Sequence, residues 1–425
     1  MKNKKMKKEE KGITLVALVV TIVVLLILAG ISLNLVIGNE GILTRSKEAA
    51  DKYGKQAENE QQGLDDIEDY LNGNVKPIKV AVNVKASGNG TINGKKAGTN
   101  NPIIPEGYTP IDAGSATWGD GSSAPAQSSV DNGLVIKDDN NNEWVWVPVE
   151  ASTLSNMYVI STKTEGETMA GDVGVTTKLY TNSTMIGKTG DTVTITRKEP
   201  NTTNYREPDL VADYDKNETY YKDILGYDTP KEMSETFEKD YANMIISIQK
   251  YGGFYIGRYE LSNEGVQKGK ATLTNKNWYE LYKKCTTLNA SDKVESKMIW
   301  GIQWDLTCDF ISKKGEQKSI TNSRDWGNYN NSTGNAAVMD GTMQKYGSKQ
   351  VTGFSEYWKA NNIYDLAGNC YEWSQEASST GGRVKRGGYY YYTASINAAY
   401  YHSQYYSPTI NKGNEDGSRP TLIIK

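Results

Sequence analysis

Residues 362–373 read NIYDLAGNCYEW, and residues 383–388 read RVKRGG. Four further motifs lie in the same half of the chain. They are YGGFYIGRYE (residues 251–260), MIWGIQWDL (298–306), DWGNY (325–329) and GSRPTLII (417–424). Taken singly, each motif is typical of a strand or a turn in a β-rich protein.

In this order and spacing the motifs resemble the sulfatase-modifying-factor family, whose formylglycine-generating-enzyme fold is a variant of the C-type lectin fold. The resemblance covers about residues 144–425 and is strongest where GGFYIGRYE, YDLAGNCYEW and RVKRGG coincide. It implies that Glu260 is a core-strand residue and that Trp373 is a core aromatic. It also implies that Arg386 and the two glycines after it lead into the ligand-facing loop.

Enzymes of this family oxidise a substrate cysteine with two active-site cysteines, which hold copper and follow the Gly-Gly pair. In this chain residues 389–397 read YYYYTASIN, which places Tyr392 and Asn397 at the matching positions. Thiolate ligands select monovalent copper, and phenol and carboxamide groups cannot replace them. We therefore expect a non-catalytic member of the family, without catalytic residues.

The segment of residues 389–408 holds eight tyrosines among small residues. Tyrosine offers a large, rigid and amphipathic surface, as it does in antibody loops, and its ring can stack on a sugar or fill a pocket on a protein. Alternatively, half of the tyrosines are strand core, because alternate positions of residues 389–393 would then be buried on one face. The predicted ligand-binding residues are Tyr389, Tyr390, Tyr391, Tyr392, Asn397, Tyr400, Tyr401, His402, Tyr405 and Tyr406.

A second resemblance is to lectin-fold proteins that are diversified by retroelements. Those proteins vary a segment after the same Gly-Gly pair, through mutation of adenines in AAC or AAT codons. Every residue of 389–408 except Gln404 has a codon that such mutation can reach. This second resemblance implies that the segment is a variable contact surface.

The N-terminal part of the chain contains a membrane-spanning sequence. Residues 13–37 are 25 residues without a charge, reading ITLVALVVTIVVLLILAGISLNLVI. At about 1.5 Å per residue, a helix of this length crosses a hydrocarbon core of about 30 Å. Six lysines precede it, which predicts a single-pass protein of the cell membrane with a cytoplasmic N-terminus and an extracellular C-terminal domain.

The lysine-rich stretch ends in Gly12 directly before Ile13, so residues 1–38 resemble a type IV prepilin. The resemblance implies cleavage between Gly12 and Ile13 by a prepilin peptidase. Ala17 stands where filament-forming subunits usually have the glutamate that pairs with a neighbouring subunit. It favours anchoring over filament assembly, and an uncleaved signal-anchor helix is the alternative.

The predicted fold is α+β: a long pilin-like transmembrane helix, a small β connector and a C-type-lectin-like domain of the formylglycine-generating-enzyme type. The predicted parts are a leader (1–12), a membrane and amphipathic helix (13–72), the connector (73–106) and the ectodomain (107–425). Within the ectodomain, EWVWVPV at 143–149 has apolar residues on both faces, which predicts a central strand. Residues 231–251 predict a helix with one apolar face, formed by Phe237, Tyr241, Met244, Ile245 and Ile248.

Composition limits the chemistry. The three cysteines, Cys285, Cys308 and Cys370, form no short metal-ligand spacing and are expected to be buried apolar residues. His402 is the single histidine, so a His-rich zinc site is excluded and a nucleophile system would need this residue.

The charge of the chain bears on its partners. The formal net charge is −3, and removal of residues 1–11, which carry +4, would leave −7. Beyond the leader no basic cluster stands out, whereas nucleic-acid binding needs one to neutralise phosphates. We therefore expect no nucleic-acid partner.

Structural calcium is the one cofactor that the lectin-like fold implies, near YDLAGN, with Asp365 and Gly368 as candidate positions. A plain turn at Asp-Leu-Ala-Gly is the alternative.

Three functions follow from the sequence. The leading one is a surface-displayed, membrane-anchored adhesin or receptor that binds an extracellular glycan or protein ligand. The alternative is a minor pilin, associated with a pilus and with other pilin subunits. The third is an oxidase, but the two cysteines that such an enzyme uses are absent at the matching positions.

Overall fold

The computed structural model describes most of the chain beyond residue 101, with gaps. The described residues are 102–105, 107–111, 127–155, 157–163, 180–181, 192–197, 205–208, 212–289, 292–333, 347–378, 382–409 and 413–425.

The chain divides into two compact units, Met1–Asp65 and Asp66–Lys425, and every described residue belongs to the second. The predicted leader, its cleavage site at Gly12 and Ile13, and the predicted membrane helix lie outside the described residues. So does nearly all of the predicted β connector. Within the described ranges, no helix has both the length and the apolar character that a membrane crossing requires.

Six strands form the main sheet, in the order β1-β2-β3-β8-β16-β9, and each neighbouring pair is antiparallel. Their bounds are β1 Tyr108–Pro110, β2 Val135–Asp138, β3 Glu143–Pro148, β8 Gly253–Gly257, β9 Val294–Met298 and β16 Pro420–Ile424. The predicted central strand is confirmed, because β3 lies between β2 and β8 and its residues 144–147 are buried. Apolar side chains on both faces of a strand require cover on both sides, which only an interior strand has.

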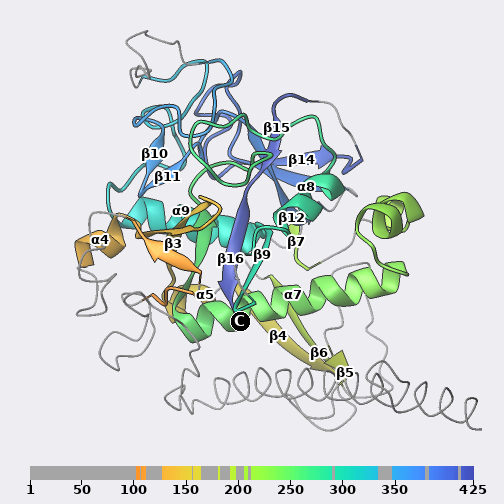
Figure 1. Cartoon of the computed structure of the whole chain (residues 1–425). Helices are drawn as coiled ribbons and strands as arrows, with labels where there is room; N and C mark the ends of the chain where they lie inside the picture. Colours follow the sequence, from red (N-terminus) through yellow and green to blue (C-terminus); the bar gives the residue numbers. More distant parts are fainter. Residues whose placement is uncertain are drawn as a thin grey trace, which may run out of the picture. The chain divides into compact units, whose positions relative to one another are not determined.

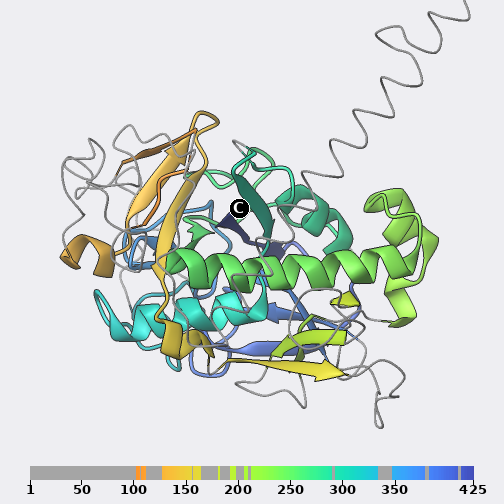
Figure 2. The same cartoon turned by 90° about the horizontal axis from the view of Figure 1, so that it is seen from below.

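Helix α7 (Pro230–Tyr251) confirms the predicted helix. It begins after Thr229, whose Oγ1 accepts a hydrogen bond from the Glu232 N–H at 3.1 Å, and ends at Gly252, with φ 77°. These are ordinary helix start and stop signals. The predicted apolar face is buried, and α7 contacts β8 and β16 (Figure 1 and Figure 2).

The other helices of the described residues are mostly short. Their bounds are α4 Gln127–Asp131, α5 Ala151–Ser155, α6 Ala212–Asp215, the π-helix η2 Thr219–Ile224, α8 Trp278–Cys285 and α9 Gly301–Lys313.

Helix α9 corrects one expectation. Residues 301–306, within MIWGIQWDL, begin this helix and are not a strand or a turn. Nearly all of the motif is buried, and a short continuous apolar run does not distinguish a buried strand from a buried helix. The helix starts at Gly301, where a Cβ would lie 2.0 Å from Cδ of Glu376.

A second sheet contains the YEW and RVKR parts of two quoted motifs. Its order is β14-β13-β12-β15, with β7 also paired to β12, and only the β12–β15 pair is parallel. Every residue of β12 is buried, including Trp373 at 1% exposure, which confirms the predicted core aromatic. The bounds are β7 Tyr205–Arg206, β12 Tyr371–Ser378, β13 Arg383–Arg386, β14 His402–Tyr406 and β15 Asp416–Ser418.

Two small sheets complete the described strands. One pairs β10 with β11, and the other has the order β4-β6-β5. Their bounds are β4 Tyr158–Lys163, β5 Tyr180–Thr181, β6 Thr192–Arg197, β10 Lys359–Ala360 and β11 Ile363–Tyr364.

Glu260 is buried but does not lie in a strand, contrary to what the family resemblance implied, because β8 ends at Gly257. Its carboxylate accepts hydrogen bonds from Thr272 Oγ1 at 2.5 Å, Asn369 Nδ2 at 2.7 Å and the Cys370 N–H at 3.0 Å. Burial, with Asp365 and Glu372 nearby, raises the pKa of Glu260 well above its usual value. The residue therefore joins the main sheet to the YDLAGNCYEW motif.

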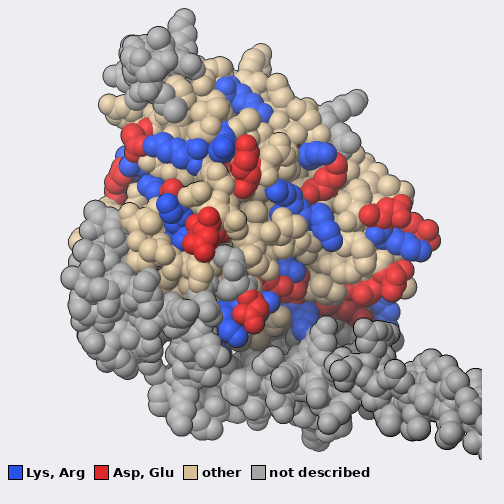
Figure 3. All heavy atoms as spheres, in the orientation of Figure 1, with Lys and Arg blue, Asp and Glu red and all other residues tan. Residues whose placement is uncertain are grey.

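Charged side chains on the face shown in Figure 3 are mixed in sign, with lysines and arginines beside aspartates and glutamates. Binding of a phosphate backbone requires an extended stripe of positive charge. The described residues of this face form no such stripe.

Candidate ligand-binding site

Residues 387–401 connect β13 to β14 through consecutive turns. Gly387 and Gly388 open this connection with φ angles of 82° and 74°, a backbone region that glycine adopts without strain. A Cβ at Gly388 would lie 2.1 Å from the backbone oxygen of Asn397. Because residues 389–401 contain no strand, the alternative that alternate tyrosines form one buried strand face is wrong for residues 389–393.

We expect Gly388→Ala to lower the free energy of unfolding by about 1 to 3 kcal/mol, because the new methyl group meets both an unfavourable φ and the Asn397 backbone. Gly269→Ala is a matched control, since Gly269 has the same φ of 74° and a Cβ there meets nothing within 4 Å. Urea unfolding monitored by circular dichroism measures both. Equal losses in the two variants would show that the contact with Asn397 has no energetic weight.

The connection displays apolar side chains to solvent. Six large hydrophobic side chains of the described residues are strongly exposed, and four of them lie within residues 391–400. These four, Tyr391 at 64%, Tyr392 at 43%, Ile396 at 66% and Tyr400 at 43%, are called the tyrosine surface below. Such a concentration of exposed apolar area is typical of an interaction site.

The backbone beneath the tyrosine surface is held by the neighbouring loop. Asn330 donates from Nδ2 to the Tyr391 oxygen at 2.6 Å and from its N–H to the Tyr392 oxygen at 3.1 Å. Trp304, in α9, donates from Nε1 to the Ala399 oxygen at 2.9 Å. The alanines of the connection point inward, with no exposed surface: Ala394, Ala398 and Ala399.

Beside the tyrosine surface lies an aromatic pocket of about 180 Å³. Its rings contact one another: Tyr389 lies 4.9 Å from Tyr371 and 4.9 Å from Tyr392, between ring centroids. The pocket is thus walled by strands of the second sheet and closed on one side by the connection. Its lining residues are Tyr371, Trp373, Lys385, Tyr389, Tyr392, Tyr406, Glu415 and Asp416.

Lys385 lines the pocket and is almost completely buried. Its Nζ is 2.8 Å from Oδ1 of Asp416 and 3.5 Å from the centroid of the Tyr406 ring. The rings of Tyr371 and Trp373 lie 4.9 and 5.2 Å away. Burial lowers the pKa of Lys385 and raises that of Asp416, while each charge stabilises the other.

The predicted contact residues are in several environments. Asn397 is buried, and its Oδ1 accepts a hydrogen bond from the Tyr371 hydroxyl at 2.9 Å. The side chain of Tyr405 lies outside the described residues. Tyr391, Tyr392 and Tyr400 are exposed. The half-buried members are Tyr389, Tyr390, Tyr401, His402 and Tyr406.

Sequence reasoning missed Ile396 and the residues that form the rest of the pocket. Lys385 belongs to a quoted motif, but its sequence gives no sign that Glu415 and Asp416 lie beside it. They are brought there by the parallel pairing of β15 with β12, a contact between distant segments that no local pattern reveals. The missed pocket residues are Tyr371, Trp373, Lys385, Glu415 and Asp416.

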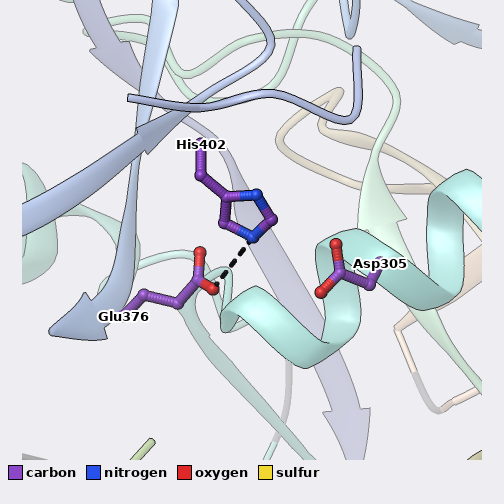
Figure 4. Close-up of side chains that lie close together, drawn as sticks. All are labelled: Asp305, Glu376 and His402. Atoms are coloured by element: carbon purple, nitrogen blue, oxygen red, sulfur yellow. Dashed lines mark ion pairs between the residues drawn. The ribbon is translucent and has the colours of Figure 1, made fainter. Parts of the chain in front are cut away.

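Under the connection, Asp305, Glu376 and His402 form a cluster whose ligand-type atoms lie within 4.8 Å of one another (Figure 4). His402 Nε2 is 3.4 Å from Oε1 of Glu376. Arg386 already bonds both acids, with Nη1 2.7 Å from Oε2 of Glu376 and Nη2 donating to Asp305. The guanidinium neutralises one of the two negative charges, so the cluster is best explained as an ion-pair network joining α9, β12, β13 and β14.

Both predicted calcium positions make contacts within the protein, but Oδ1 of Asp365 is buried without a hydrogen-bond partner among the described residues. Asp365 is buried, with φ 56°, and its Oδ2 accepts a hydrogen bond from the Gly353 N–H at 2.6 Å. Gly368 has φ 79°, and a Cβ there would lie 2.1 Å from the Asn328 oxygen. Among the described residues, Asp365 joins no group of three metal-ligating side chains. The backbone forms a turn here, and calcium binding at these positions stays a prediction.

All three cysteines are buried free thiols, as expected from the sequence. Burial raises the pKa values of Cys285 and Cys308 to about 12, and that of Cys370 well above its usual value. They therefore remain protonated thiols at physiological pH, whereas copper binding and nucleophilic attack need the thiolate.

Comparison with known proteins gives weak structural likeness alone. No family model matches the chain, and no curated protein matches it. Among solved structures, it is similar to Treponema denticola variable protein 1, with a TM-score of 0.26 and 14% sequence identity. The match covers 41% of this chain and 85% of that chain, and at this strength it assigns neither fold nor function.

Proposed function

We propose that the chain is a non-catalytic binding protein of the cell surface, which contacts an extracellular ligand through the tyrosine surface and the aromatic pocket. One observation carries the proposal: four of the six strongly exposed large hydrophobic side chains of the described residues lie within ten consecutive positions, 391–400. Scattered apolar residues on a surface need no explanation, but a local concentration does.

The support beneath these side chains favours binding. The hydrogen bonds from Asn330 and Trp304 fix the backbone of the connection before any ligand arrives. Tyrosine has only two side-chain torsions to restrict on binding. A preformed surface loses little conformational entropy when it is covered, so more of the contact energy remains as affinity.

We further propose the anchoring that the N-terminal sequence indicates, with residues 13–37 in the membrane and the second unit outside. If a prepilin peptidase processes the chain, the mature protein should begin at Ile13, and N-terminal sequencing of protein from its native membrane measures this. A Gly12→Val variant should remain full-length. Mature protein that begins at Met1 would instead support an uncleaved signal anchor.

A minor-pilin role is the second candidate, favoured by the Gly12–Ile13 junction in the sequence. An oxidase is not proposed, because tyrosine and asparagine stand at the positions of the family's thiols. The lectin-type fold and the diversification of residues 389–408 remain proposals that rest on the quoted motifs.

The binding surface is tested by a triple variant, Tyr391→Ala, Ile396→Ala and Tyr400→Ala. None of these side chains lines the aromatic pocket. Loss of two or three central contacts of about 2 kcal/mol each should weaken binding on the order of 1,000-fold or more. Labelled full-length protein applied to a glycan array and to cultured cells measures this.

Tyr357→Ala is the matched control, because Tyr357 is 51% exposed and lies outside the connection. It should bind as the wild type does. If the triple variant also binds normally while its circular dichroism spectrum is unchanged, the tyrosine surface is not the contact site.

A further inference from the structure

The charges of the aromatic pocket are not balanced. Lys385 is engaged by Asp416 at 2.8 Å and is only 3% exposed, so it is not available to a ligand. Glu415 is half-buried at the pocket, and its carboxylate has no hydrogen-bond or ion-pair partner among the described residues. The pocket therefore presents one uncompensated negative charge.

The described part of the connection and of β14 supplies no charged Lys, Arg, Asp or Glu side chain to offset this charge. Residues 389–409 contain no lysine, arginine, aspartate or glutamate. Glu415 faces the tyrosines: burial, together with Tyr392 and the Glu415 carboxylate, raises the pKa of Tyr389 to about 12. Tyr389 therefore remains a neutral phenol at physiological pH and adds no charge of its own.

Aromatic rings with a carboxylate beside them are a favourable environment for a cation, because the face of each ring carries negative potential. The protein already uses this chemistry once. The Lys385 ammonium lies against the rings of Tyr406, Tyr371 and Trp373 in the same pocket. Among the described residues no cation lies over the rings of Tyr389 and Tyr392, which line the same pocket as Glu415.

The size of the pocket and its surroundings indicate which kind of ligand would carry the cation. A volume of about 180 Å³ is below the several hundred Å³ of common small-molecule sites, and it suits the head group of one side chain. The tyrosine surface next to it includes Ile396, 66% exposed. An aliphatic side chain offers no flat ring for a sugar to stack on, but it packs well against a protein.

We infer that the ligand of this protein is another protein, and that the aromatic pocket receives a basic side chain of that partner, with arginine as the best fit. The guanidinium would stack on Tyr389 or Tyr392 and pair with Glu415. This inference rests on the proposed binding function and adds the class of partner and the residue that selects it. An anionic group is disfavoured, because it would meet the free Glu415 carboxylate while Lys385 is already paired.

The test uses the full-length protein in detergent micelles and ligand-observed saturation-transfer NMR. The probes are N-acetyl-arginine methylamide, its neutral isostere N-acetyl-citrulline methylamide, and the methyl glycosides of glucose, galactose and mannose. The arginine probe should bind at least about tenfold more tightly than the citrulline probe, as expected for a charge-assisted contact. The glycosides should give no saturation.

Glu415→Gln removes the charge and keeps the shape, and it should weaken the arginine probe about tenfold. Glu235→Gln makes the same chemical change on the exposed face of α7 and should have no effect. Equal binding of arginine and citrulline probes, or wild-type binding by Glu415→Gln, would overturn the inference. Saturation of a glycoside would identify a glycan site in its place.

Two variants distinguish the arginine contact in the pocket from the proposed binding function of the tyrosine surface. The triple variant at Tyr391, Ile396 and Tyr400 leaves the pocket lining intact, so it should keep the arginine probe while it loses cell binding. If cell binding is lost in the triple variant but Glu415→Gln binds the arginine probe normally, the tyrosine surface is supported as the contact site. The inference of a basic partner residue in the pocket is then refuted.

Discussion

Arg419→Leu should lower the free energy of unfolding by about 3 to 5 kcal/mol, because it leaves a buried carboxylate without its cation. Arg419 has no exposed surface. Its Nε and Nη2 contact Oε1 of Glu372 at 3.1 and 2.6 Å, and Nη1 donates to the Gly257 oxygen at 2.8 Å. The one side chain thus joins the residue between β15 and β16 to β12 and to the end of β8.

The loss should depend on pH in a defined direction. Burial raises the pKa of Glu372, and Arg419 opposes this rise. Without Arg419 the folded-state pKa should rise further above the unfolded value of about 4.3. A folded-state pKa above the unfolded one favours the protonated acid, so the variant's stability should fall as pH rises. Urea unfolding at pH 5 and pH 8 should show the larger loss at pH 8.

Two controls isolate the effect of the buried charge. In the double variant Arg419→Leu with Glu372→Leu, no buried charge remains, so it should be more stable than Arg419→Leu alone. Lys231→Leu breaks an exposed pair with Glu235, 83% and 61% exposed, and should cost less than about 1 kcal/mol. A loss at Arg419 no larger than that at Lys231 would contradict the prediction.

Arg386→Met should destabilise the protein by a similar amount, about 3 to 5 kcal/mol, and should also impair binding. Its guanidinium pairs with Glu376 at 2.7 Å, donates to Asp305 and lies 5.6 Å from the Trp304 ring. It also donates to the Tyr400 oxygen at 3.4 Å, directly beneath the tyrosine surface. Removing the guanidinium leaves Asp305 and Glu376 close together without the cation that offsets their repulsion, beneath the connection.

Thermal unfolding measures the stability loss, and cell binding measures the second effect. Adding Glu376→Gln to Arg386→Met should recover part of the stability, because the fully buried acid is then neutral. Arg324→Met is the control, since Arg324 is exposed and its Nε bonds only to the Asn331 oxygen at 2.6 Å within its own loop. The prediction is wrong if Arg386→Met and Arg324→Met have the same melting temperature.

Local sequence patterns predicted the elements whose caps and buried positions all lie within one continuous stretch of residues. The helix of residues 230–251 carries its cap, its stop signal and one apolar face in its own sequence, and the strand at 143–148 shows its central place by apolar residues on both faces. The start of α9 at Gly301 was not predictable in this way. Its side chains are buried on most sides, so they show neither the two-residue nor the 3.6-residue period.

The candidate site likewise has features that the sequence predicted and features that only the tertiary structure revealed. The tyrosine-rich composition of residues 389–406 and the absence of charge there are properties of one continuous segment, and the sequence alone indicated a contact surface. The tertiary structure decided which side chains face solvent, because turns, and no strand, connect β13 to β14. It also decided the chemistry of the pocket. The pairing of β15 with β12 brings Asp416 to Lys385 and places Glu415 at the same pocket, where it has no ion-pair partner among the described residues.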